Sequence, residues 1–181
     1  MTIVLGYALA LAGLTIAIVA IAPMLSGGVK YGAARIMLIN LLRTDPNQAE
    51  RLCRGVKGTF FEAVTAAIST AAMTMSRDPK AITSASLPAF DAASMGVATQ
   101  WKQRVGKGRL ACILAGIGLG LAISKNAVPV VIVICGVGTV GGWIWLMVTK
   151  AEVERALLRA RGEILPEVDR AFVDGRYTHA R

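Results

Sequence analysis

The sequence is poor in the side chains that usually perform chemistry. It has one histidine, His179, close to the end of the chain, and this scarcity argues against a histidine-based metal centre or catalytic site. Its three cysteines, Cys53, Cys112 and Cys135, lack C-x-x-C spacing, and we interpret them as small core residues. No carboxylate pair, nucleophile–base arrangement or phosphate-binding loop is recognisable. We therefore expect a protein that is not an enzyme and holds no cofactor or metal.

Charged residues are missing from three stretches, 1–29, 110–124 and 127–149. About 18 apolar residues cross the bilayer core, so the first and third stretches are long enough. The middle one becomes long enough if Lys107 and Arg109 extend their charged ends to the interface. A buried or re-entrant segment is its alternative. A cleavable signal peptide is the alternative for the first stretch, but no basic residue precedes its apolar core.

The predicted fold is an all-α integral membrane protein with three transmembrane helices, at about 2–25, 107–124 and 127–149, and a helical cytoplasmic stalk. No strand pattern is present. The expected regions are transmembrane helix 1 at 1–25, a cytoplasmic helical region at 26–106, a transmembrane hairpin at 107–149 and a cytoplasmic helical tail at 150–181.

Helix signals are clear in the region at 26–106. Asp45 and Pro46 predict a helix start, and Thr59 and Glu62 have the spacing of a capping box. Pro88 is expected to begin a helix that continues into the second span. An apolar face with helical spacing follows Thr59. Its members are Phe60, Val64, Ala67, Ile68, Ala71 and Met75.

Acidic residues are few, 11 against 20 Lys or Arg, and the net charge is +9. Residues 26–109 hold 12 basic residues against 5 acidic ones, so this segment and the tail should lie in the cytoplasm. The N-terminus and the turn around Asn126 should then lie outside. We attribute the positive charge to this topology and to attraction for anionic lipids, and we expect no nucleic-acid partner.

Glycine is abundant in the predicted spans. Gly116 and Gly120 lie four apart in the second span, and Gly138 and Gly142 lie four apart in the third, while the first contains Gly6 and Gly13. Small residues four apart allow two membrane helices to approach closely. These glycines are expected to pack helices, either within one subunit or around the axis of a symmetric oligomer.

Thr139 and Ser124 are the polar residues that remain in the hairpin. A threonine within a span usually bonds its hydroxyl to a carbonyl one turn earlier. The alternative is that Thr139 lines a pore or a partner interface. Beyond Lys107 and Arg109 at the start of the second span, the spans contain no Asp, Glu, His, Lys or Arg, so a proton-conducting complex would need a titrating group from a partner.

The layout and the stretch GVGTVGG, residues 136–142, resemble the ExbB/TolQ/MotA proton-channel family, especially its three-span ExbB/TolQ branch. The threonine of that stretch is Thr139. The resemblance implies an inner-membrane homo-oligomer, a pentamer, around a single-span partner of the ExbD/TolR/MotB type whose aspartate carries the proton. In that family the motif lies in the second span, whereas here it lies in the third.

Two functional hypotheses therefore stand. One is a ring-forming subunit, in the bacterial inner membrane, of an ion-driven motor or energy-transducing complex. The other is a membrane scaffold or assembly factor that conducts nothing. A fivefold ring around a central helix pair would favour the first.

Overall fold

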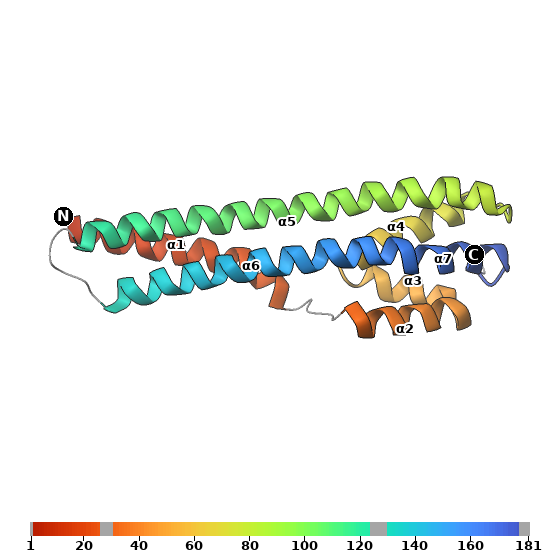
Figure 1. Ribbon diagram of the computed structural model, residues 1–181, viewed down its shortest axis with the longest axis horizontal. Coiled ribbons are helices and arrows are strands. Elements are labelled where there is room, and N and C mark those ends of the chain that lie inside the picture. The colour runs from red at the N-terminus through yellow and green to blue at the C-terminus, as the bar shows by residue number, and fades with distance from the viewer. Residues whose placement is uncertain (1, 26–30, 124–129, 178–181) are drawn as a thin grey trace. The chain divides into compact units, whose positions relative to one another are not determined.

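The computed structural model describes residues 2–25, 31–123 and 130–177, and within these ranges the chain forms helices joined by short turns and no strand (Figure 1). This confirms the all-α prediction for the described residues. The helices are α1 (Thr2–Leu25), α2 (Tyr31–Thr44), α3 (Pro46–Arg54), α4 (Phe60–Met73), α5 (Pro79–Ile123), α6 (Val130–Glu163) and α7 (Leu165–Val173).

The chain divides into two compact units. Unit 1 consists of residues 1–26 and 101–151, and unit 2 consists of residues 27–100 and 152–181. Unit 1 therefore contains α1 and the apolar parts of α5 and α6, while unit 2 contains the remaining helices. The long helices α5 and α6 each contribute to both units.

Two stretches of the described residues are long and apolar enough to cross a membrane, where the sequence predicted three. They are Val4–Ala22, with a mean hydropathy of 2.4, and a window within Val133–Val173 with a mean hydropathy of 1.4. The predicted middle span, 107–124, is not among them. The uncharged part of this segment runs from Leu110 to Ile123, where the described helix ends. It is therefore shorter than the ~18 residues that a span needs.

Two predicted helix starts are confirmed. The Asp45 side chain accepts hydrogen bonds from the backbone N–H groups of Asn47 and Gln48, and Pro46 opens α3. Thr59 caps α4 by accepting from the N–H of Phe61. Glu62 reaches back as in a capping box, but it accepts from the N–H of Gly58, 2.8 Å away, and not from that of the capping residue.

Two other expectations were wrong. Pro88 does not begin a helix but lies inside α5. A proline there removes one helical hydrogen bond, and the buried neighbours Ile82, Ser86 and Phe90 hold this part of the helix in unit 2. Met75 does not continue the apolar face of α4, because the helix ends at Met73 and Met75 is 85% exposed. The other predicted members of that face are buried.

The helices of unit 2 enclose a conventional apolar core. Leu38 and Leu42 of α2 are buried with most of the inner face of α4, and α2 and α4 each contact both α3 and α7. Cys53 of α3 lies in this core, where burial and the nearby Glu50 carboxylate raise the pKa of its thiol to about 12. The thiol is therefore protonated at neutral pH, as expected for a core cysteine.

Ion pairs join the helices at the surface of unit 2. The Arg43 guanidinium donates two hydrogen bonds to Glu167, of 2.8 and 3.1 Å, and thereby lowers the pKa of that carboxyl. Glu163 accepts from the Tyr31 hydroxyl at 3.0 Å and pairs with Arg35 at 2.7 Å. Burial and the bond to Glu163 raise the pKa of Tyr31 well above its usual range. These contacts tie α2 to α7 and to the end of α6.

Candidate functional site: the packed apolar helices around Thr139

One face of α1 consists only of glycine and alanine. Its buried residues recur at spacings of three and four along the helix, so they form a single stripe. They are Gly6, Ala10, Gly13, Ala17 and Ala20. A stripe without longer side chains lets a neighbouring helix approach the α1 backbone directly.

Helix α5 presents a matching stripe of small residues to α1, namely Ala111, Ala115 and Gly118, all buried. A Cβ atom built on Gly13 would lie 2.7 Å from the carbonyl oxygen of Ala111, and one built on Gly118 would lie 2.7 Å from that of Gly6. Any side chain at Gly13 or Gly118 would thus force backbone to move. Because Gly6 faces Gly118 and Gly13 faces Ala111, the two helices run antiparallel (Figure 1).

Helix α6 completes unit 1. Ala10 packs with Cys135 in one apolar cluster. A Cβ on Gly142 would lie 2.8 Å from the end of the Ile21 side chain, and one on Gly138 would lie 3.6 Å from Leu14. The predicted glycines of the third span therefore do lie against the first helix, but they face flexible side chains.

Thr139 is fully buried within unit 1. Its hydroxyl donates to the carbonyl oxygen of Gly136 at 2.9 Å, which is the local bond expected of a threonine inside a span. The thiol of Cys112 on α5 donates to the Thr139 carbonyl oxygen at 3.4 Å. In the single chain, Thr139 is thus buried, its hydroxyl bonds its own helix, and its backbone carbonyl lies against α5.

The glycines predicted in the second span behave differently. Around Cβ positions built on Gly116 and Gly120, no atom of the described chain lies within 4 Å beyond the immediate backbone, and the same holds for Gly136 and Gly141 of α6. These four glycines lie on outer faces of unit 1, next to exposed apolar side chains such as Ile117. Ser124, the other predicted polar site residue, lies outside the described residues.

The sequence analysis did not single out the residues of α5 that make the closest contacts. Gly108 lies against Trp143 and Leu146 of α6, while Gly118 packs against α1 together with Ala111 and Ala115. Their spacing is visible in the sequence once alanine is counted with glycine as a small residue. A search restricted to glycines four apart selects Gly116 and Gly120 on the opposite face.

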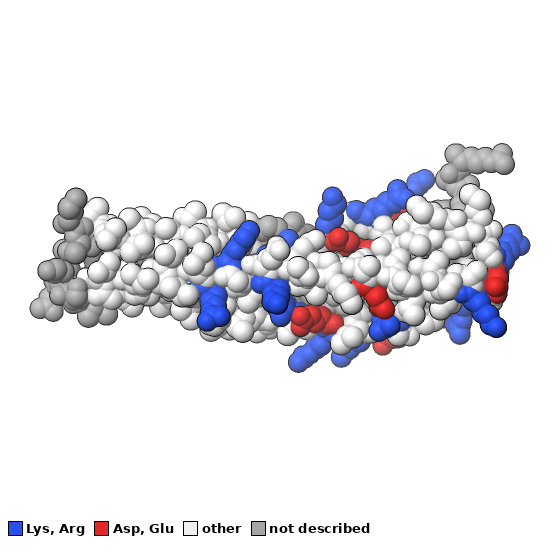
Figure 2. Space-filling view, turned by 90° about the horizontal axis from the view of Figure 1, so that it is seen from above, with Lys and Arg blue, Asp and Glu red and all other residues white. Residues whose placement is uncertain are grey.

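Unit 1 has no acidic residue, and its described basic residues stand at one end of its apolar part. Lys102, Lys107 and Arg109 are exposed on α5, and the Arg104 guanidinium lies 5.7 Å from the centre of the Trp101 ring. Residues 2–25, 110–123 and 130–149 include no Asp, Glu, Lys or Arg, and the face shown in Figure 2 is accordingly uncharged over these described residues. Such a change from basic to uncharged surface is typical of a membrane boundary.

No group of three or more potential metal ligands occurs among residues 2–25, 31–123 and 130–177. Compared with known proteins, the chain matches no family model, no curated protein and no solved structure.

Proposed function

We propose that the protein is the ring-forming inner-membrane subunit of an ion-driven complex that works with a single-span partner. The observation that carries the proposal is the outer surface of unit 1. It is uncharged and apolar, and Ile113, Ile117 and Ile144 each expose half of their surface. Water disfavours so large an apolar surface, whereas lipid or a neighbouring subunit would cover it.

The glycines on this surface support self-association. No atom of the described chain lies close to Cβ positions built on Gly116, Gly120 and Gly141. The backbone of another helix can therefore approach these glycines without displacing a side chain. Helices in a bilayer associate through close packing of this kind. We propose a cyclic homo-oligomer, a pentamer, in which copies of unit 1 meet through these faces.

The basic residues support one orientation. With Lys102, Lys107 and Arg109 on the cytoplasmic side, α5 crosses the membrane as the second of three spans, the N-terminus lies outside and unit 2 lies in the cytoplasm. The same side chains would attract anionic lipid headgroups. In this proposal the snorkelling lysine and arginine side chains lengthen the short apolar run of α5.

The proton-driven part of the proposal is based on an absence in the sequence and on the family resemblance. Apart from Lys107 and Arg109 at the start of the second span, the three predicted spans contain no Asp, Glu, His, Lys or Arg. Proton transfer across a membrane needs a titrating group at depth, so the partner must supply it, as the GVGTVGG resemblance implies.

Particle symmetry in nanodiscs tests the assembly. Electron microscopy of the purified chain should show rings with a single cyclic symmetry, and native mass spectrometry should give one subunit number, five. A monodisperse monomer, both in mild detergent and in nanodiscs, would contradict the proposal.

A non-conducting scaffold or assembly factor is the second candidate, and the position of Thr139 favours it. A residue that borders a partner's titrating acid must be accessible to that partner, whereas Thr139 is fully buried within its own chain and bonds its hydroxyl to Gly136. The substitution Thr139→Val keeps the shape and removes the hydroxyl. In an ion-driven ring the variant should assemble normally but transport more slowly.

Assembly and proton uptake should be measured together, with membrane vesicles from cells that express the chain with its native partners. Unchanged uptake in an intact Thr139→Val ring would remove Thr139 from the transport path. Absence of chain-dependent uptake in the wild type, with rings present, would leave the scaffold as the function.

A further inference from the structure

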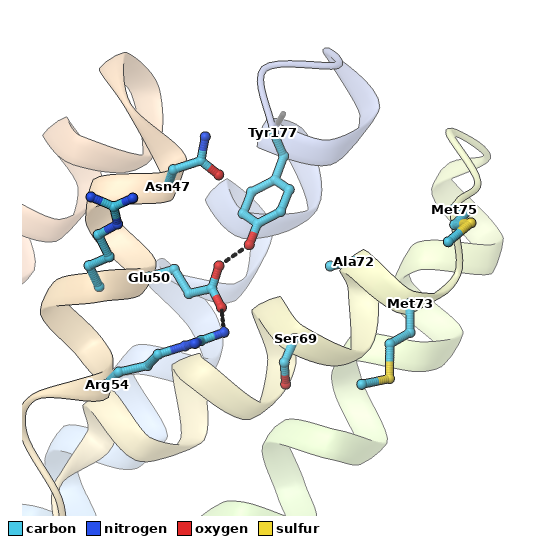
Figure 3. A pocket seen from close by; sticks show the side chains of 9 residues that line it. Asn47, Glu50, Arg54, Ser69, Ala72, Met73, Met75 and Tyr177 are labelled. Atoms are coloured by element: carbon cyan, nitrogen blue, oxygen red, sulfur yellow. Dashed lines mark hydrogen bonds and ion pairs between the residues drawn. The ribbon is translucent and has the colours of Figure 1, made fainter. Parts of the chain in front are cut away.

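Unit 2 contains a cavity of about 520 Å³ between α3, α4 and the C-terminal segment (Figure 3). Its walls are formed by α3 (Asn47, Glu50, Arg51, Arg54), by α4 (Ser69, Ala72, Met73), by Met75 after α4, and by Tyr177. A cavity of this size is within the range of small-molecule sites, and it combines charged and apolar walls as such sites do.

Glu50 organises the charged wall. This residue is only 8% exposed, and both of its carboxylate oxygens are occupied (Figure 3). One pairs with the Arg54 guanidinium and the other accepts a hydrogen bond from the Tyr177 hydroxyl. The carboxylate is therefore neutralised by its own neighbours and holds Arg54 and Tyr177 in position.

The charge that remains in the cavity is positive. Arg51 and Arg54 lie three apart on α3 and both line the cavity. Since Glu50 offsets one of the two guanidinium groups, the other stays uncompensated. Arg51 is exposed and makes no hydrogen bond or ion pair with the described part of the chain, so its guanidinium can bind an anion in fork geometry.

The opposite wall, which begins with Ser69 and Ala72, ends in two methionines. Met73 is 78% exposed and Met75 is 85% exposed, which is unusual for side chains of this type. Met75 also has a φ of 49°, a left-handed backbone conformation that is strained for a residue other than glycine. Flexible methionine side chains adapt readily to an apolar ligand.

We propose that this cavity binds a small organic anion, a phosphate monoester or carboxylate with an apolar portion. The anionic group lies against Arg51 and Arg54, and the apolar portion lies over Met73 and Met75. The Tyr177 hydroxyl donates to Glu50 and lines the same cavity. This site belongs to unit 2 and is independent of whether unit 1 forms a ring.

Phenyl phosphate and benzyl alcohol are suitable probes, because they share an aromatic ring and differ in charge. Their binding to the full-length protein in phosphatidylcholine nanodiscs can be titrated by saturation-transfer NMR, with empty nanodiscs as the blank. We expect saturable binding of phenyl phosphate, at least about tenfold tighter than that of benzyl alcohol, because charge-assisted bonds to arginine dominate. Inorganic phosphate should displace it only at higher concentration.

The variant Arg51→Gln should weaken phenyl phosphate binding at least about tenfold while the helical content and the midpoint of thermal unfolding stay unchanged. The matched control is Arg155→Gln, which removes an exposed arginine of α6 outside the cavity and should not affect binding. Met73→Gln should weaken phenyl phosphate more than inorganic phosphate. No saturable binding, equal binding of the neutral probe, or an equal loss in Arg51→Gln and Arg155→Gln would overturn the proposal.

Discussion

At the scale of single residues, two kinds of glycine occur on α5. Gly118 is in direct contact with the α1 backbone, since an added Cβ atom would come within 2.7 Å of the Gly6 carbonyl oxygen. Gly116, two residues earlier, has no such neighbour in the described chain. The first kind determines how the subunit packs, and the second is available for contacts with other molecules.

This difference predicts opposite outcomes for the same substitution. Gly118→Ala should reduce the free energy of unfolding by about 1 to 3 kcal/mol, because one methyl group overpacks a contact between two backbones. Gly116→Ala should leave it unchanged or raise it by up to about 1 kcal/mol, as alanine favours the helix. Both can be measured by SDS titration in mixed micelles under conditions that keep the chain monomeric. Equal destabilisation by the two variants would show that the α1–α5 contact is wrong.

At the scale of elements, the pairs between α2 and α7 depend on charge. Glu167 of α7 accepts both hydrogen bonds from Arg43 of α2, and Arg176 near the C-terminus donates to the Arg43 carbonyl oxygen at 3.2 Å. The side chain of Glu167 is largely buried whereas that of Arg43 is exposed. Loss of the carboxylate charge would therefore remove the main polar link between the two helices.

The lowered pKa of Glu167 predicts how unit 2 responds to acid. The carboxyl is more acidic in the folded chain than in the unfolded chain, so its bond to Arg43 stabilises the fold fully above the unfolded pKa of about 4.3. This stabilisation is lost as the pH falls toward the folded pKa. Replacement by Gln should lower stability at neutral pH, and the difference from the wild type should shrink below about pH 4.

Urea unfolding of the full-length chain in nanodiscs at several pH values measures this effect. Glu152→Gln is the matched control, because Glu152 is an exposed glutamate of α6 without an ion pair to the described residues. A stability difference between the wild type and Glu167→Gln that does not change with pH would exclude the ionic contribution of the Arg43 contact.

The element boundaries that depend on local chemistry were predictable from the sequence. The caps at Asp45 and Thr59 were recognisable because a side-chain oxygen satisfies free N–H groups of the first turn wherever the helix packs. The continuity of α5 through Pro88 was not recognisable. It depends on burial of Ile82 and Phe90 on both sides of the proline, which is a tertiary contact.

The candidate site was predicted only in outline. Close packing of small residues was expected and occurs, and Gly6 and Gly13 of the first span take part in it. Their partners on α5 are Ala111, Ala115 and Gly118, however, and not the predicted Gly116 and Gly120. Which face of α5 turns toward α1 depends on the whole three-helix arrangement and not on a short motif. The local hydrogen bond of Thr139 follows from its own backbone and was therefore predictable.

At the scale of the whole molecule, the charged residues are strongly segregated. The surface of α1 and the apolar parts of α5 and α6 is uncharged, and the acidic residues all belong to unit 2 (Figure 2). We infer from this segregation that unit 1 lies in a bilayer and unit 2 in water. The proposals of a ring, of a single-span partner and of attraction for anionic lipids all depend on that assignment.

Cysteine accessibility in sealed membrane vesicles of known orientation tests it most directly. In a background without Cys53, Cys112 and Cys135, single cysteines at Ser84, Glu152 and Asn126 can be labelled with a maleimide that does not cross membranes. The account predicts that the cysteines at positions 84 and 152 react only from the cytoplasmic side and the one at position 126 only from the outside. Labelling of all three from the same side would contradict the three-span membrane topology.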